Sequence, residues 1–119
     1  MAIPNGIATI VSFLAASAAR TAAPLNPGYK EEEFRVYLDD TNARVLLLPP
    51  EGIDEARRAA GDVPVLTVDT SPEGVVSLRE VSDRVPVAPP GLGDVGLILH
   101  TCGSTGRPKL IEAGSDSRL

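Results

Sequence analysis

The order of apolar and polar positions predicts two helices in the first 40 residues. Apolar residues wrap most of a first helix, which Asn5 caps and which ends near Arg20, and this pattern is typical of a helix packed on a sheet. An amphipathic surface helix is predicted over residues 30–40, because its apolar positions fall at i, i+3 and i+4 behind three glutamates in the first turn. The apolar positions are Ile7, Ile10, Val11, Phe13 and Leu14 in the first helix and Phe34, Tyr37 and Leu38 in the second.

Short apolar runs, separated by turn residues, predict strands and one more helix. The expected strands are 44–48, 65–68, 75–78 and 94–101, and the expected turns are 26–28 and 71–74. A short helix is expected over 53–60 with Gly61 as its C-cap. The resulting strand–helix–strand order predicts an α/β fold with a partial, mainly parallel sheet and flanking helices. The segment 84–93, rich in proline and glycine, is interpreted as a connector.

Composition narrows the class of protein. The 119 residues suit one domain, and 43% hydrophobic residues suffice for a core, which must be aliphatic because only 3% are aromatic. The net charge of −5 does not indicate a basic surface that could bind a phosphate backbone, so nucleic acid is not expected as a partner. The single Cys102 excludes an internal disulfide and a Cys-based metal site, and His100 has no second ligand nearby.

The apolar run 7–19 does not indicate a membrane or secretory segment. It falls short of the roughly 20 residues that a transmembrane helix needs. A signal peptide would carry Lys or Arg ahead of its apolar part, and neither residue occurs in the first 19 positions. We therefore expect no membrane span and a cytoplasmic location.

Chemistry is expected in the segment 101–109, which follows the last predicted strand. Glycines let successive backbone N–H groups converge on an anion, hydroxyls add donors, and a lysine supplies positive charge. The pattern is not a Walker A motif, because Gly106 is two residues too far from Lys109 and no Ser or Thr follows the lysine. From composition alone, a simple turn remains an equal alternative. The candidate phosphate-binding residues are Thr101, Cys102, Gly103, Ser104, Thr105, Gly106 and Lys109.

The residues HTCGSTGRPK closely resemble the HTSGTTGRPK signature of the adenylate-forming, AMP-binding superfamily, which includes acyl-CoA synthetases, luciferases and peptide-synthetase adenylation domains. The upstream pattern AAPLNP, EEF and YL also resembles acid–CoA ligases, so that the resemblance covers most of residues 4–111. Small- and medium-chain acid–CoA ligases, including the oxalate–CoA ligases, look most similar. The chain is thus interpreted as a partial AMP-binding domain over 1–119, a fragment of the large N-terminal domain, with a divergent polar tail at 112–119.

The resemblance implies an ATP- and Mg²⁺-dependent reaction. A carboxylate attacks the α-phosphorus of ATP to give an acyl-adenylate and pyrophosphate, and coenzyme A then displaces AMP. By position, the segment 101–109 would contact the β- and γ-phosphates, with Ser104 and Thr105 as donors and Lys109 as counter-charge. Cys102 replaces the usual serine and Leu110 the usual glycine, which weakens the expected affinity for phosphate.

The family's acyl pocket, acidic magnesium motif, adenine pocket and C-terminal domain match no part of this sequence, so no catalytic residue and no metal ligand is assigned. We expect the chain alone to be inactive. Two alternatives are a non-catalytic module that associates with a full-length ligase or with itself through an exposed sheet edge, and a split enzyme completed by a separate chain. The terminal Ser117-Arg118-Leu119 resembles a peroxisomal targeting signal.

Overall fold

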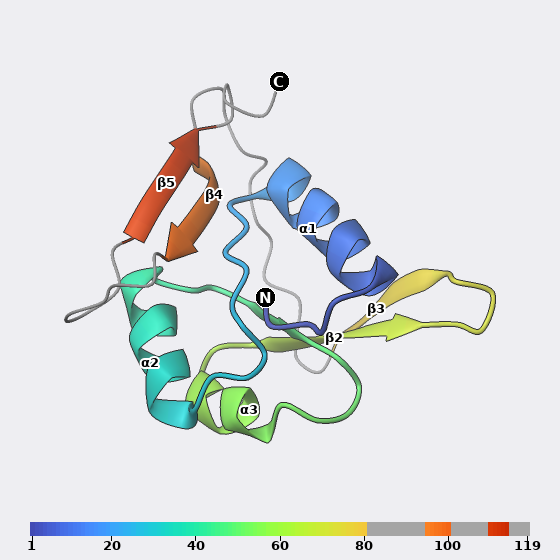
Figure 1. Ribbon diagram of the computed structural model, residues 1–119, viewed down its shortest axis with the longest axis horizontal. Coiled ribbons are helices and arrows are strands. Elements are labelled where there is room, and N and C mark those ends of the chain that lie inside the picture. Colours follow the sequence, from blue (N-terminus) through green and yellow to red (C-terminus); the bar gives the residue numbers. More distant parts are fainter. Residues whose placement is uncertain (81–94, 101–109, 115–119) are drawn as a thin grey trace.

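Two small sheets and three helices make up the part of the chain that the structure describes (Figure 1). The structure, a computed structural model, describes residues 1–80, 95–100 and 110–114. The helices are α1 (Ile7–Ala19), α2 (Glu31–Asp40) and α3 (Asp54–Ala60). The strands are β1 (Leu46–Leu48), β2 (Val65–Thr70), β3 (Val76–Glu80), β4 (Val95–His100) and β5 (Leu110–Gly114).

The larger sheet has three strands in the order β1-β2-β3 and is mixed. Strands β1 and β2 are parallel, because the connection between them contains α3 and is long enough for a crossover. Strands β2 and β3 are antiparallel, because the short turn at 71–75 allows only a hairpin. The α/β class is confirmed, and the expectation of a mainly parallel sheet holds for the first pair but not for the second.

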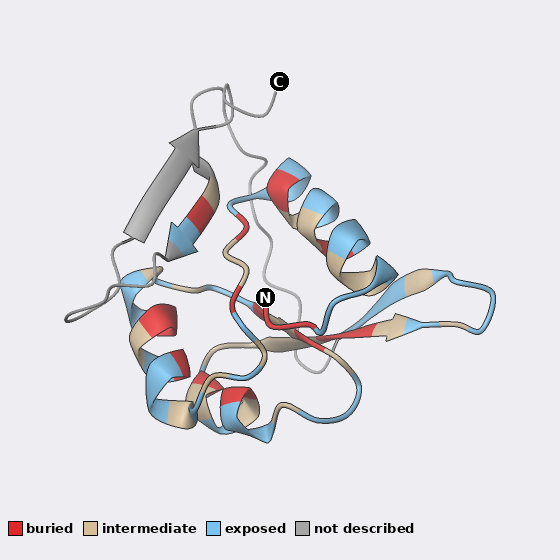
Figure 2. Cartoon of the chain, in the orientation of Figure 1, coloured by how far each residue is buried: buried red, intermediate tan, exposed pale blue. Residues whose placement is uncertain are grey.

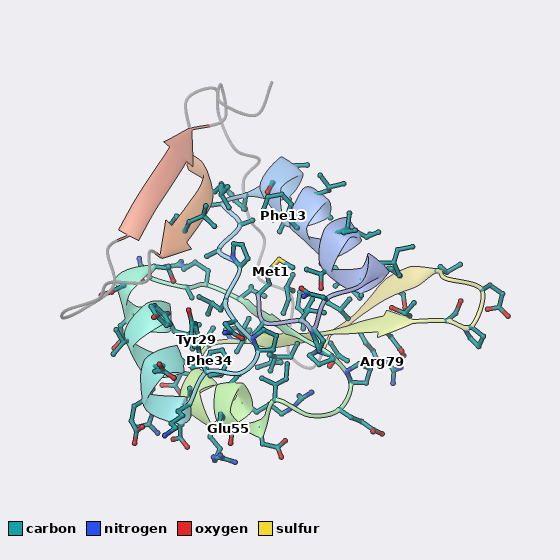
Figure 3. All side chains as sticks on the ribbon, in the orientation of Figure 1. Met1, Phe13, Tyr29, Phe34, Glu55 and Arg79 are labelled. Atoms are coloured by element: carbon teal, nitrogen blue, oxygen red, sulfur yellow. The ribbon has the colours of Figure 1, made fainter. Side chains whose placement is uncertain are left out.

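Helices α2 and α3 cover one face of this sheet. Their buried side chains form a cluster with β1, in which Phe34, Leu46 and Leu48 are completely buried. The rings of Tyr29 and Phe34 pack edge to face, with their centroids 5.8 Å apart. Figure 3 labels both residues. Helix α2 begins as predicted, since the backbone N–H of Lys30 donates to Oε2 of Glu33 at 2.8 Å in a capping box. This side holds the main core (Figure 2).

Helix α1 lies against the opposite face of the sheet, and the segment Met1–Ile3 lies along the edge of the sheet next to β1. Met1, Ile3 and Val68 form a second cluster, against which Phe13 of α1 packs. The backbone N–H of Ala2 donates to the carbonyl oxygen of Leu47 at 3.0 Å, so this segment runs beside β1. The sheet is therefore enclosed between α1 on one side and α2 with α3 on the other (Figure 1).

The predicted packing of α1 on a sheet is confirmed, but its predicted cap is wrong. Asn5 does not cap the helix, because the N-cap position falls on Gly6 and no side chain bonds there; instead Oγ1 of Thr9 donates to the carbonyl oxygens of Ile3 and Pro4. Of the five apolar residues that wrap α1, only Phe13 packs against a core cluster. The other four point outward, because the buried face of α1 is made of smaller side chains, among them Ser12 and Ser17.

The predicted turns and the C-cap of α3 are confirmed. The backbone N–H of Gly28 donates to Oδ1 of Asn26 at 2.9 Å, and that of Gly74 donates to the carbonyl oxygen of Ser71 at 2.9 Å. Gly61 ends α3 with a positive φ of 55°, which glycine adopts freely. Ile53, the N-cap of α3, has the same φ although it is β-branched, and its side chain packs against the main core.

Candidate nucleotide-phosphate site

The predicted phosphate segment 101–109 lies between β4 and β5 in the sequence. All seven of its candidate residues fall outside the residues that the structure describes, as do the connector 84–93 and the terminal tripeptide 117–119. The strands on both sides of the segment are described, and they define where it starts and ends.

Strands β4 and β5 pair antiparallel, and His100 lies opposite Leu110 in the register. The two ends of the segment 101–109 are consequently held at neighbouring positions of a two-stranded sheet. Strand β4 was predicted, but β5 was missed, although its first residues, Leu110 and Ile111, are apolar and suit a strand. Residues 112–114 of the predicted polar tail belong to β5.

Among the described residues, a backbone contact joins this hairpin to the segment between α1 and α2, and α1 also lies against β4. Leu97 forms a parallel bridge with Ala22, and the N–H of Ile98 donates to the carbonyl oxygen of Ala22 at 2.8 Å. Both Ala22 and Ile98 are buried. The register of the hairpin shifts between Val95 and Leu97, where Gly96 is the extra residue of a bulge-like irregularity.

Two of the hollows on the surface of the described part of the chain have volumes of about 530 and 440 Å³. The first lies between the C-terminal ends of α2 and α3, and its charged residues are two arginines and two aspartates, Arg35, Arg44, Asp39 and Asp62. The second lies beside the start of α1, and its one charged residue, Asp69, pairs with Arg79. Neither hollow brings a nucleophile next to a base, so neither is a better candidate than the segment 101–109.

The lowered pKa values of the Met1 amine and the Glu31 carboxyl have structural causes. Burial lowers the pKa of the Met1 amine to about 5, while this amine donates to the carbonyl oxygen of Ala23 at 2.8 Å. The hydrogen bond from Arg58 lowers the pKa of Glu31. Within residues 1–80, 95–100 and 110–114, no group of three His, Cys, Asp or Glu residues could hold a metal ion. The same ranges contain no helix long and apolar enough to cross a bilayer.

Comparison with known proteins decides the family. The model of the family described as AMP-binding enzyme matches residues 1–113. The chain belongs to the AMP-binding enzyme family. It is 40% identical over 119 residues to the probable CoA ligase CCL9 of Humulus lupulus and 36% identical over 118 residues to the oxalate–CoA ligase of Arabidopsis thaliana. Each alignment includes 92% of this chain and 23% of the relative.

The fold is also similar to that of a solved structure. The crystal structure of apo MatB from Rhodopseudomonas palustris matches with a TM-score of 0.66 and 25% identity, over 97% of this chain and 24% of that one. This member of the AMP-binding enzyme family therefore spans about a quarter of the length of these relatives. The expected resemblance to the adenylate-forming superfamily and to acid–CoA ligases is confirmed.

Proposed function

We propose that this chain supplies the ATP-phosphate-binding segment of an AMP-forming carboxylic acid–CoA ligase. The observation that supports the proposal is the pairing of His100 with Leu110. A phosphate-binding loop needs both of its ends to lie close together on rigid secondary structure. Its hydrogen-bond donors can then converge on one anion. The antiparallel register of β4 and β5 provides such a frame on both sides of residues 101–109.

The residue types of the segment suit the β- and γ-phosphates of ATP. Gly103 and Gly106 allow the backbone to turn its N–H groups inward, Ser104 and Thr105 add hydroxyl donors, and Lys109 adds a positive charge. Mg²⁺ would arrive with the nucleotide, and no residue of this chain is assigned to it. The segment would position and neutralise the phosphates rather than carry out a bond-making step.

The isolated chain is expected to bind without catalysis. Adenylation of a carboxylate and its transfer to coenzyme A require an acyl pocket and general electrostatic support around the α-phosphorus. The chain aligns with only 23% of its CoA-ligase relatives, so most of that machinery belongs to sequence beyond the aligned part. Release of pyrophosphate from ATP by the purified chain, with any carboxylic acid present, would contradict this expectation.

Isothermal titration with Mg-ATP and with pyrophosphate tests the proposal directly. The wild-type chain should bind both, and Lys109→Ala should weaken both by at least about tenfold, as expected when one charge-assisted contact is lost. Lys30→Ala is the matched control, because the chain has two lysines and Lys30 is exposed at the start of α2. No binding by a folded wild-type chain, or equal losses in the two variants, would exclude the proposed role.

A further inference from the structure

The loop of residues 49–53, which joins β1 to α3 (Figure 1), has a strained backbone. Gly52 and Ile53 both have a positive φ, of 78° and 55°. Glycine adopts such values freely, but a β-branched side chain collides with its own backbone there, so Ile53 is strained. Ile53 is also the N-cap of α3 and forms no side-chain hydrogen bond, because it has no acceptor. Local preferences therefore oppose this conformation, and another contact must stabilise it.

The side chain of Arg57 supplies such a contact. Arg57 lies on α3, and its guanidinium donates to three carbonyl oxygens of the loop. Nη2 donates to the oxygen of Pro49 at 2.5 Å and to that of Pro50 at 3.2 Å. Nε donates to the oxygen of Gly52 at 3.4 Å. A planar guanidinium carries several donors in a fixed geometry, so one side chain ties the loop to α3 at three points.

The charge of Arg57 is balanced differently from that of the arginines in ion pairs. Arg35, Arg58 and Arg79 each pair with a carboxylate. Arg57 is half-buried and forms no ion pair among the described residues, so carbonyl dipoles alone stabilise its charge. Hydrogen bonds from a charged donor are roughly twice as strong as neutral ones. The three bonds are therefore able to offset the strain at Ile53.

The loop lies where α/β sheets usually bind their ligands. Pro49 and Pro50 line the hollow of about 440 Å³, together with Asn5 and Gly6 at the start of α1 and Thr70 at the end of β2. This hollow is located beyond the carboxyl ends of the parallel strands β1 and β2, the edge at which open α/β sheets bind ligands. Strained residues are found mainly in active sites, ligand clamps and switch regions.

We propose that residues 49–53 are a two-state loop and that Arg57 is the strap that holds it in the strained state. With the guanidinium bound to the three carbonyls, the loop keeps the conformation described above and forms one wall of the hollow. When the guanidinium leaves, Ile53 returns to an extended φ, the carbonyls turn to solvent, and this wall moves. The proposal involves neither residues 101–109 nor a nucleotide, so it is tested independently of phosphate binding.

NMR relaxation dispersion on the full chain tests the proposal through the backbone amides of residues 51–53. Arg57→Met keeps most of the length of the side chain but removes all its donors. This variant should raise the population of the second loop conformation at least about tenfold, because three hydrogen bonds favour the first. The carbon-13 shifts of Ile53 should move toward the values of extended backbone. Unchanged populations and shifts in Arg57→Met would overturn the proposal.

Arg58→Met is the matched control, since Arg58 is the next residue of α3 and pairs with Glu31 and Glu55 instead of the loop. It should leave the loop populations at their wild-type values. In Arg57→Met, but not in the control, the amide signals of Gly6 and Thr70 should also shift, because both residues line the hollow. Equal effects of the two variants would mean that α3 as a whole, and not the strap, determines the loop conformation.

A second substitution tests whether strain is what the strap opposes. Ile53→Gly removes the β-branched side chain, so the positive φ no longer carries a penalty. In this background Arg57→Met should raise the population of the second conformation less than about threefold. The packing of the Ile53 side chain against the main core is lost in both members of the comparison and cancels. A tenfold rise in both backgrounds would overturn the proposal, because the guanidinium would then hold an unstrained loop.

Discussion

The backbone N–H of Ile98 and the carbonyl oxygen of Ala22 are joined by a 2.8 Å hydrogen bond that links β4 to the segment between α1 and α2. Ala22 and Ile98 are far apart in sequence, yet both are buried. Together with the contacts between α1 and β4, this bond holds the hairpin that flanks residues 101–109 to the rest of the fold. Loss of this bond should therefore destabilise the hairpin more than the main core.

Ile98→Pro should release the hairpin, because proline lacks the N–H that donates to Ala22. We expect hydrogen exchange to become faster for the backbone amides of β4 and β5, while the amides of α2 and β1 keep their protection. Ile98→Val is the control, since it keeps the N–H and should cost only about 1 kcal/mol. Uniform loss of protection in the proline variant would show that the hairpin and the main core unfold together.

The buried Met1 amine should make stability depend on pH. Its pKa falls from 8.0 to about 5 in the folded chain, so between these values the unfolded chain binds a proton that the folded chain does not. The free energy of unfolding should consequently decrease as the pH falls from 8 to 5, by an amount on the order of 4 kcal/mol for a difference of about three pH units. Below about pH 5 this contribution should become constant.

Urea unfolding at a series of pH values measures this effect, on protein whose intact mass shows that Met1 is present. An acetylated N-terminus is the matched control, because it cannot be protonated and should remove this part of the pH dependence. The same slope in acetylated and free chains would assign the effect to other groups.

Two hydroxyl groups of α1 should respond in opposite ways to removal. Oγ1 of Thr9 donates to the carbonyl oxygens of Ile3 and Pro4, so Thr9→Val should lower the free energy of unfolding by about 1 kcal/mol. Oγ of Ser12 is buried and has no hydrogen-bond partner among the described residues. Ser12→Ala should therefore raise the free energy of unfolding by up to about 1 kcal/mol, helped by the better helix propensity of alanine. Chemical denaturation of both variants would measure these changes, and destabilisation by Ser12→Ala would reveal a partner for that hydroxyl.

Glu31 connects α2 to α3 through Arg58, whose Nε donates to Oε2 of Glu31 at 2.8 Å. This hydrogen bond is the main reason why the pKa of the Glu31 carboxyl is lowered, and Arg35 contributes less. The ion pair should stabilise the fold above the ordinary carboxyl pKa of 4.5 and lose this effect as the pH falls through the lowered value. In a carbon-13 NMR titration, Arg58→Gln should return the pKa of Glu31 closer to 4.5 than Arg35→Gln does. The reverse order would identify Arg35 as the main partner.

Local patterns allowed the prediction of α2 and β4 but not of the buried face of α1. The apolar spacing and the glutamates of the first turn placed α2 to within one residue, because both signals act within the helix itself. In α1 the apolar residues occur on nearly every side, so the buried face depends on which surfaces meet it, and these come from β2, β3 and the segment Met1–Ile3. The spacing of apolar residues within a helix carries no information about contacts with residues far away in the sequence.

The candidate segment was found from its residue types and its resemblance to a family signature. The sequence did not indicate the second strand of its frame, because Leu110 and Ile111 are followed by Glu, Ala and Gly, which are poor strand formers. The pairing of β4 with β5 supplies the hydrogen bonds that overcome this weak preference. The contact of Ala22 with Leu97 leaves no local signal in either segment.

The hairpin of β4 and β5 has a consequence for the order of folding events. Pairing His100 with Leu110 closes only a short loop, whereas pairing Ala22 with Leu97 closes most of the chain. The entropy lost on closing a loop rises with its length, so the short-range pairing has the smaller entropic barrier, and isolated hairpins form within about 1–10 μs. During synthesis residues 1–80 emerge from the ribosome before β4 does. We therefore expect β4 and β5 to pair with each other first. The hairpin then attaches to the earlier part of the chain through Ala22 and Leu97.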